Sequence, residues 1–381
     1  MKRILSVIVV VVVTLTQTAQ IKAFAQETDK PAVNAQACVL YCVDDGKVYF
    51  SVNENKKMKP ASTTKLMTSL ITLEYADSAD KVVAFTKDMT AEGSSMYLKV
   101  GEKVKLSDLA AGMMMASGND AANAAAISIA GSAEKFSGLM NNRAAVIGMK
   151  NTHFVTPSGL DDENHYSTAY DMALLMSYAL ENESFAKLTS QKSVTVEFSE
   201  PQSKRTTYTN HNRLLSMYEY CTGGKTGYTM AAGRCLVSSA KKDGLTFVCV
   251  TLNDRNDWND HIALYNYGFS KLACVECDDS DYYLEIPCAG GDDESIGVTG
   301  TKGKNVVVPF DKKSNVVRTA YADNFLYAPV KDGDIVGRIE YTLDGKTLAS
   351  TNLTAVEYSN TQNKNKSIWT KIKDFFTYGK E

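Results

Sequence analysis

The pattern of apolar residues changes near residue 277, and this change constrains the fold more than any other feature of the sequence. From residue 26 to 276 apolar residues follow both helical and strand spacing, whereas from 277 to 358 they fall only in short runs between turns. The turns are marked by Gly290-Gly291, Lys302-Gly303, Asp332-Gly333 and Asp344-Gly345. The sequence therefore predicts an α/β (α+β) domain at 26–276 and a small all-β domain at 277–358.

Within the first domain, four segments have helical spacing and two resemble strands. The apolar stripe after Ser62 consists of Leu66, Met67, Leu70, Ile71 and Leu73, and further helices are predicted at Leu106–Met115, Ala121–Ala130 and Ala169–Leu180. The segments Cys235–Ala240 and Leu245–Leu252 are predicted strands of one hairpin, because Lys-Lys-Asp-Gly joins them. We therefore expect a central antiparallel sheet flanked by helices.

The two ends of the chain carry their own signals. Lys2 and Arg3 precede the apolar run Ile4–Val13, and a small-x-small site ends at Ala25, which predicts a secretory signal peptide at 1–25. The alternative is an uncleaved N-terminal anchor, and in either case the protein is expected to act outside the cytoplasm, at the outer face of the cytoplasmic membrane or in the cell wall. Residues 359–381 form a polar linker and a short basic segment whose apolar residues share one helical face. These apolar residues are Ile368, Trp369, Ile372, Phe375 and Phe376. The segment predicts an amphipathic helix that binds a membrane surface, with a helix docked on the protein itself as the alternative.

Composition excludes several functions. The formal net charge is -3, which argues against nucleic-acid binding. The four histidines form no close ligand pair, and the single CxxC at Cys274 and Cys277 has no second pair, so no metal site is expected. Eight cysteines in an exported chain permit disulfides, but their spacing leaves both the pairing and the redox state open.

Three short motifs carry the chemistry, and the first is Ser62-Thr63-Thr64-Lys65. A serine and a lysine three residues apart lie on one face of a helix. Serine needs a base to become a nucleophile, and a neighbouring lysine can act as that base if its amine is neutral. Burial and a second nearby cation both lower a lysine pKa. Such a pair also arises in helices by chance.

The second and third motifs are Ser117-Gly118-Asn119 and Lys225-Thr226-Gly227 followed by Tyr228. The motif Ser117-Gly118-Asn119 lies between two predicted helices, where it could be only a helix cap. Alternatively, Ser117 relays a proton and Asn119 holds a substrate amide. In the other motif, Gly227 would allow close approach of a substrate backbone. The simpler interpretation of this motif is a hairpin with an exposed lysine.

The order of the three motifs, SxxK, SxN and KTG, is typical of penicillin-binding proteins and class A β-lactamases. Their surroundings are KPASTTKLMT, ASGNDAA, IGMKNTHFVTPSGLDDENHYSTAYDMALL and GGKTGYTMAAGRCLV. With these, the chain resembles the low-molecular-mass penicillin-binding proteins that act as D-alanyl-D-alanine carboxypeptidases, with a β-lactamase/transpeptidase-like catalytic domain. APVKDGDIVGRIEY resembles the β domain that follows in these enzymes, and the terminal segment resembles their membrane anchor.

The resemblance implies a role for each residue. Ser62 would attack the carbonyl between the two D-alanines, Lys65 would take its proton, and Ser117 and Lys225 would return a proton to the leaving nitrogen. The backbone N–H groups of Ser62 and Tyr228 would form the oxyanion hole.

Asn119 would position the peptide and Thr226 would bind its terminal carboxylate. Arg255 resembles the family arginine near that carboxylate, although it could equally be a surface arginine. His211 stands where some relatives carry an arginine.

The expected function is removal of the terminal D-alanine from peptidoglycan stem peptides through an acyl-serine, without a cofactor. β-Lactams are the expected inhibitors. A β-lactamase is disfavoured, because PSGLDDENHYS fits the carboxypeptidases better than a loop with a deacylating glutamate. An endopeptidase that cuts cross-links and a penicillin-sensing module remain as alternatives, and the third residue of the stem peptide is left open.

Overall fold

The computed structural model describes residues 30–290 and 294–356. The chain divides into two compact units between Ala273 and Cys274. The predicted signal peptide and the predicted C-terminal amphipathic helix both lie outside the described residues. Within the described ranges, no helix combines the length and the apolarity needed to cross a bilayer.

The first unit is built on a five-stranded sheet in the order β2-β1-β9-β8-β7, with antiparallel neighbours throughout. Its strands are β1 (Ala37–Cys42), β2 (Lys47–Val52), β7 (Cys221–Thr229), β8 (Gly233–Lys242) and β9 (Leu245–Leu252). The predicted hairpin is confirmed as β8 and β9, and the expected central antiparallel sheet is confirmed with it. Because β7 is an edge strand, alternate backbone groups along it face away from the sheet.

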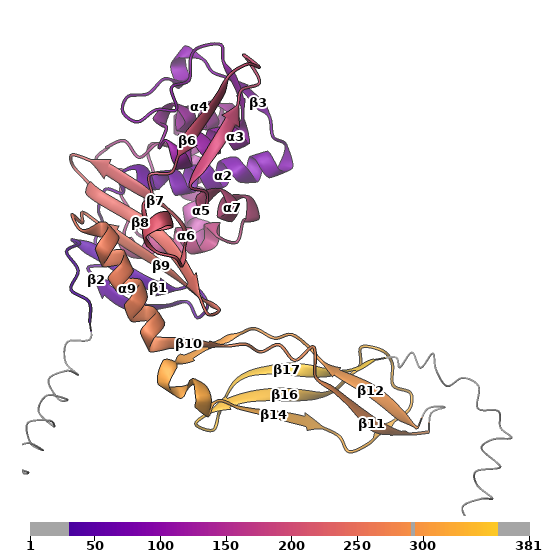
Figure 1. Cartoon of the computed structure of the whole chain (residues 1–381). Helices are drawn as coiled ribbons and strands as arrows, with labels where there is room; N and C mark the ends of the chain where they lie inside the picture. Colours follow the sequence, from indigo (N-terminus) through magenta and orange to yellow (C-terminus); the bar gives the residue numbers. More distant parts are fainter. Residues whose placement is uncertain (1–29, 291–293, 357–381) are drawn as a thin grey trace, which may run out of the picture. The chain divides into compact units, whose positions relative to one another are not determined.

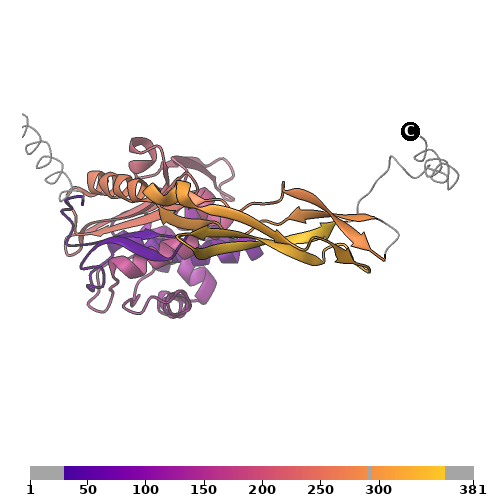
Figure 2. The same ribbon diagram turned by 90° about the horizontal axis from the view of Figure 1, so that it is seen from below.

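Successive residues of these strands point to opposite faces of the sheet, and helices cover both faces (Figures 1 and 2). On one face, α9 (Asp257–Lys271) packs so closely that a Cβ added at Gly268 would lie 3.0 Å from Leu40. On the other face, α6 (Ala169–Ala179) contacts β1, where the rings of Tyr41 and Tyr170 meet edge to face. The sheet is therefore a middle layer between helices.

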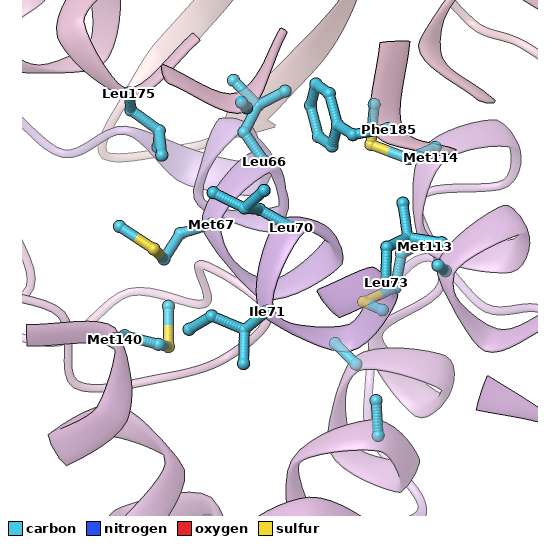
Figure 3. Packing of buried hydrophobic residues seen from close by; sticks show 14 of the residues in the cluster. Leu66, Met67, Leu70, Ile71, Leu73, Met113, Met114, Met140, Leu175 and Phe185 are labelled. Carbon is cyan, nitrogen blue, oxygen red and sulfur yellow. The ribbon is translucent and has the colours of Figure 1, made fainter. Parts of the chain in front are cut away.

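Helix α2 (Lys65–Ser78) lies at the centre of the helical layer, and residues Lys65–Leu73 are all buried. Its apolar side chains pack against α3 (Leu106–Met115), α5 (Ala133–Ile147), α6 and α7 (Glu183–Thr189), as Figure 3 shows. The predicted helix is confirmed, but it is buried on every side, so that even its polar face of Lys65, Thr68, Ser69 and Thr72 is covered. Thr68 fits there because its hydroxyl donates to the carbonyl of Pro157 at 2.6 Å.

Shorter elements complete this unit. They are η1 (Ala61–Thr64), β3 (Val82–Ala84), η2 (Lys87–Met89), β4 (Lys103–Lys105), α4 (Asn119–Ala130), β5 (Ser193–Glu197), β6 (Arg205–Thr209) and α8 (Leu214–Met217). The helices predicted at 106–115, 121–130 and 169–180 are confirmed as α3, α4 and α6, with ends that differ by up to two residues.

The second unit is a sheet structure, as predicted. Its six-stranded sheet has the order β14-β16-β17-β12-β11-β15, and β10 pairs with β13. The elements are β10 (Leu272–Val275), β11 (Tyr283–Ala289), β12 (Ser295–Gly300), β13 (Val306–Pro309), η3 (Phe310–Asn315), β14 (Val317–Ala322), β15 (Leu326–Tyr327), β16 (Ile335–Leu343) and β17 (Lys346–Val356). Its small core includes Ile286, Val298, Ile339 and Leu353. Buried Asp279 accepts hydrogen bonds from Arg318, Tyr341 and Thr351.

Candidate active site

A cleft of about 530 Å³ in the first unit brings the three sequence motifs together. It is lined by Ser62, Ser94, Ser117, His211, Thr226, Gly227, Tyr228, Arg234, Cys235, Asp257 and Trp258. Lys65, Asn119 and Lys225 are not part of this lining, and each of them is at most 4% exposed. The motifs therefore supply both the surface of one cleft and a buried layer of polar side chains beneath it.

Ser62 lies in the short 3₁₀ turn η1, directly before α2. Two glycines approach this turn closely, so that a side chain at Gly159 would collide with it and one at Gly227 would make an unusually tight contact. A Cβ at Gly227 would lie 3.0 Å from the backbone nitrogens of Ser62 and Thr63, and one at Gly159 would lie 2.0 Å from the carbonyl oxygen of Ala61. The missing side chain of Gly227 thus makes room for the helix start, and the close approach of a substrate backbone at Gly227 stays a prediction.

Lys65 is completely buried, and its Nζ has three acceptors. It donates to Ser62 Oγ at 3.0 Å, to Asn119 Oδ1 at 2.6 Å and to the carbonyl of Ser158 at 2.7 Å. Burial, with a smaller contribution from the charge of Lys225, holds the pKa of Lys65 well below its usual range. The three donated bonds belong to the ammonium form. The neutral amine keeps two N–H groups for Asn119 and Ser158 and has a lone pair for the Ser62 hydroxyl, whose proton it can accept.

Lys225 is the second buried lysine of the site. Its Nζ donates to the carbonyl of Thr226 at 2.8 Å, and burial lowers its pKa to about 7. Because side chains alternate along a strand, Lys225 and Gly227 share the face of β7 toward Ser62, whereas Thr226 and Tyr228 share the other face. The strand thus presents a titratable amine on one side and a hydroxyl on the other.

Asn119 is bound at both ends of its side-chain amide. Its Oδ1 accepts from Lys65, and its Nδ2 donates to the carbonyl of Glu92 at 2.6 Å. The next residue, Asp120, accepts from Ser95 Oγ and from the backbone of Met96 at 2.7 and 2.8 Å. These bonds fix the loop that carries Ser94 into the cleft. Each end of the Asn119 amide has room for one further partner, since Oδ1 has a second lone pair and Nδ2 a second N–H group, so the expected contact of Asn119 with substrate needs no present bond to break.

Ser117 lies between α3 and α4 in a left-handed backbone conformation, with φ of 56°. This conformation is uncommon for a residue with a side chain. It places a serine that is only 5% exposed on the lining of the cleft. The sequence indicated only that Ser117 lies at the junction of two helices. Its left-handed conformation and its place in the cleft lining go beyond what a simple helix cap needs.

The loop within PSGLDDENHYS closes the site behind Lys65, a contact that the sequence analysis did not predict. It supplies the carbonyl of Ser158, and buried His165 ties it to the helix start. His165 Nδ1 accepts from the backbone nitrogens of Val155 and Thr156 at 3.0 and 3.2 Å, so Nε2 carries the proton and donates to Thr64 Oγ1 at 2.9 Å. Burial lowers the pKa of His165 to about 4, which keeps it neutral in this role.

The structure does not bring Arg255 to the cleft. Arg255 is exposed on the connection between β9 and α9, and the arginine of the lining is Arg234 on β8. His211 does line the cleft, and burial together with the charge of Lys225 lowers its pKa. All eight cysteines lie within the described residues, and none of them forms a disulfide there. Cys235 among them borders the cleft.

A serine hydroxyl hydrogen-bonded to a buried lysine, at the start of a helix and beside an edge strand, is the arrangement of a serine hydrolase that works without histidine. Comparisons with known proteins agree. Residues 24–256 match the D-alanyl-D-alanine carboxypeptidase family, and residues 278–359 match the C-terminal domain of penicillin-binding protein 5. The chain belongs to the D-alanyl-D-alanine carboxypeptidase family and is a serine-type peptidase.

Relatives of known name cover nearly the whole chain. D-alanyl-D-alanine carboxypeptidase DacF of Bacillus subtilis is 32% identical over 94% of this chain and 94% of its own. DacC of Escherichia coli is 34% identical over 88% and 87%. Among solved structures, penicillin-binding protein 5 of Haemophilus influenzae superposes with a TM-score of 0.65 at 29% identity, covering 86% of this chain and 98% of that one.

Proposed function

We propose that the chain removes the terminal D-alanine from peptidoglycan stem peptides, with Ser62 as the nucleophile and Lys65 as its base. The observation that carries this proposal is the 3.0 Å hydrogen bond between Lys65 Nζ and Ser62 Oγ, with Lys65 buried beneath the cleft. Lys65 takes the hydroxyl proton while Oγ attacks the carbonyl between the two D-alanines. The oxygen of the tetrahedral intermediate then receives hydrogen bonds from the backbone N–H groups of Ser62 and Tyr228.

Collapse of the intermediate breaks the C–N bond and needs a proton on the leaving nitrogen. Ser117 and Lys225 are the proposed relay, because Ser117 lines the cleft and the lowered pKa of Lys225 lets it both hold and release a proton near neutral pH. D-Alanine leaves, and the acyl group remains on Ser62. Water then hydrolyses this ester, which yields the shortened peptide and restores the serine.

Asn119 has a positioning role in this scheme. Its Oδ1 accepts from Lys65 Nζ, and its Nδ2 donates to the carbonyl of Glu92 in the loop that carries Ser94. Asn119 therefore orients the base Lys65 directly. Thr226 lines the cleft. We propose that its hydroxyl binds the terminal carboxylate of the substrate. We propose no substrate contact for exposed Arg255.

The setting of the reaction follows from the substrate. Peptidoglycan lies outside the cytoplasmic membrane, in keeping with the signal peptide predicted at 1–25 and the membrane-binding helix predicted within 359–381. β-Lactams are proposed to acylate Ser62 and act as inhibitors. The acidic residues of the PSGLDDENHYS loop, Asp161, Asp162 and Glu163, are the candidates for a deacylating base, and none of them is part of the cleft lining, so a penicilloyl enzyme is expected to be long-lived.

The proposal predicts that Ser62→Ala abolishes release of D-alanine from a pentapeptide ending in D-Ala-D-Ala. Free D-alanine is measured for the wild-type chain and the variant, and a fluorescent penicillin reports acylation in parallel. We expect the wild type to release D-alanine and the variant to release it at least about 10³-fold more slowly. Labelling of Ser62 without any release of D-alanine would contradict the proposal and favour the endopeptidase or the sensing module.

A second prediction concerns pH. The charge of Lys225 contributes to the lowered pKa of Lys65, so removal of this charge by Lys225→Gln should raise the pKa of Lys65. Acylation needs neutral Lys65. The acidic limb of the pH profile of the acylation rate should therefore move to higher pH in the variant. The loss of acylation rate on substitution is expected to be several times larger at about pH 6, where Lys225 is charged, than at about pH 8. A loss that is equal at all pH values would refute this coupling.

A further inference from the structure

Strand register brings several segments of the second unit to the end of its sheet where β17 stops at Val356. Val356 pairs with Gly297 near the start of β12, β16 begins at Ile335 beside the end of β17, and β15 pairs with the last residues of β11. The loop before β16 lies there too, because Gly333 donates a backbone hydrogen bond to Ala355. Figure 1 shows the ends of β11 and β17 on this side of the unit. We call it the exit end, since the chain continues from it into residues 357–381.

Exposed apolar side chains gather at the exit end. Tyr327 is 71% exposed, Ile335 is 65% exposed and Phe325 is 49% exposed. The rings of Phe325 and Tyr327 meet edge to face with 5.1 Å between their centroids, so they form one apolar surface. Leu326 between them is buried in the small core, and the two rings therefore point away from that core. A contiguous exposed apolar surface of this kind typically marks a site that another group covers.

The side chains around this apolar surface carry a negative balance of charge. Glu294 precedes β12, Asp323 follows β14, and Asp332 and Asp334 lie in the loop before β16; all four are exposed. Lys331 in the same loop offsets one of these charges. Carboxylates disfavour a direct contact with anionic lipid headgroups and favour a basic partner. The exit end therefore fits a partner that is both apolar and basic.

The chain itself supplies a segment with this chemistry. From Lys364 to Glu381 the sequence has five lysines against two acids, and its apolar residues, Trp369 and Phe376 among them, are predicted to share one helical face. Residues 357–367 can span up to about 40 Å at roughly 3.6 Å per residue, whereas a six-stranded sheet is about 25 Å wide. The segment can therefore turn back onto the exit end. A short tether gives it an effective concentration of about 1 mM, so that even a weak contact is occupied.

We propose that residues 368–376 dock on the exit end of the second unit, with their apolar face on Phe325, Tyr327 and Ile335 and their lysines beside the carboxylates. The same apolar face is predicted to bind a membrane surface, and it cannot contact both surfaces at once. The dock therefore covers this face in water, and a membrane must displace the dock. The inference goes beyond the proposed function, because it concerns how the chain meets the membrane and not what it cleaves.

The test measures how far acrylamide quenches the fluorescence of Trp369 in the exported chain, residues 26–381. The chain has two tryptophans, so subtraction of the signal of Trp369→Phe isolates this one. Without vesicles, the quenching constant of Trp369 should be about fourfold lower than in a synthetic peptide of residues 359–381. Phe325→Ser/Tyr327→Ser should raise it to the value of the peptide. The charge variant Glu294→Gln/Asp323→Asn keeps both rings and should also raise it.

Phe310→Ser is the matched control, since it removes an aromatic side chain that is 61% exposed at the opposite end of the unit, before β14 begins. It should leave the quenching of Trp369 unchanged. Phosphatidylglycerol vesicles provide a second readout. Because the dock competes with the membrane, Phe325→Ser/Tyr327→Ser should bind them at an about fourfold lower lipid concentration than the wild type.

Three outcomes would overturn the inference. Quenching of wild-type Trp369 that equals that of the peptide would mean that only a membrane covers this segment. Protection that persists in both the ring variant and the charge variant would place the segment elsewhere on the protein. Protection that grows with protein concentration would make a second copy of the chain the partner.

Discussion

Replacement of Lys65 by methionine should lower the rate of acylation of Ser62 by about 10²- to 10⁴-fold, the usual contribution of a general base. Methionine has a similar length and no proton acceptor of comparable strength. Lys65 Nζ lies 3.0 Å from Ser62 Oγ, and burial keeps its pKa well below the usual range. The second-order rate constant for labelling by a fluorescent penicillin measures the effect, and D-alanine release should fall in parallel.

Lys65→Arg separates basicity from positive charge. A guanidinium stays protonated in proteins, so this variant always carries the positive charge and cannot accept the serine proton. Its acylation rate should fall about as far as that of the methionine variant. If Lys65→Arg kept most of the rate, Lys65 would act through its charge alone and the proposed base would be wrong.

Stability must be measured alongside the rates. Removal of the Lys65 ammonium or amine leaves Asn119 Oδ1 and the carbonyl of Ser158 without this donor. Buried acceptors without partners cost about 1–3 kcal/mol. The free energy of unfolding of each variant therefore shows whether a folded fraction large enough for the kinetic comparison is present.

Local sequence patterns predicted several elements of the fold, although they missed the helices α5 and α9 and the strands β1 and β2. Periodic apolar residues indicated α2, α3, α4 and α6, and the turn between two apolar runs indicated the hairpin of β8 and β9. These signals lie within one element or between neighbours in sequence. The change of pattern near residue 277 likewise predicted a sheet-only second unit, because turn spacing is also a local property.

Contacts between distant segments could not be predicted in this way. The carbonyl of Ser158 meets Lys65 from a loop 93 residues away, and its role depends on backbone geometry that no residue type encodes. Arg255 matched a family pattern by its place after β9, yet Arg234 on the neighbouring strand reaches the cleft. Which of two arginines enters a site depends on strand register and on partners such as Asp257.

Gly159→Ala is the second substitution for which we expect a large effect. A Cβ at this position would lie 2.0 Å from Ala61 O, 2.6 Å from Ala61 C and 2.8 Å from Thr64 Oγ1. The glycine also has φ of +81°, which disfavours any side chain. Backbone strain and overpacking together should lower the free energy of unfolding by about 2–5 kcal/mol, measured by denaturant titration.

Gly148→Ala is the matched control, because Gly148 has φ of +89° and a Cβ there would meet no atom within 4 Å. Gly148→Ala should lower the free energy of unfolding only by the cost of the left-handed backbone conformation, about 1–2 kcal/mol. The clash at Gly159 is with the residue before Ser62, so relief of the clash must move the helix start that carries the nucleophile. Acylation of the folded Gly159→Ala protein should therefore be slower than wild type, whereas that of Gly148→Ala should be unchanged. Equal effects of the two substitutions on stability and on acylation would mean that the loop at Gly159 does not hold Ser62 in place.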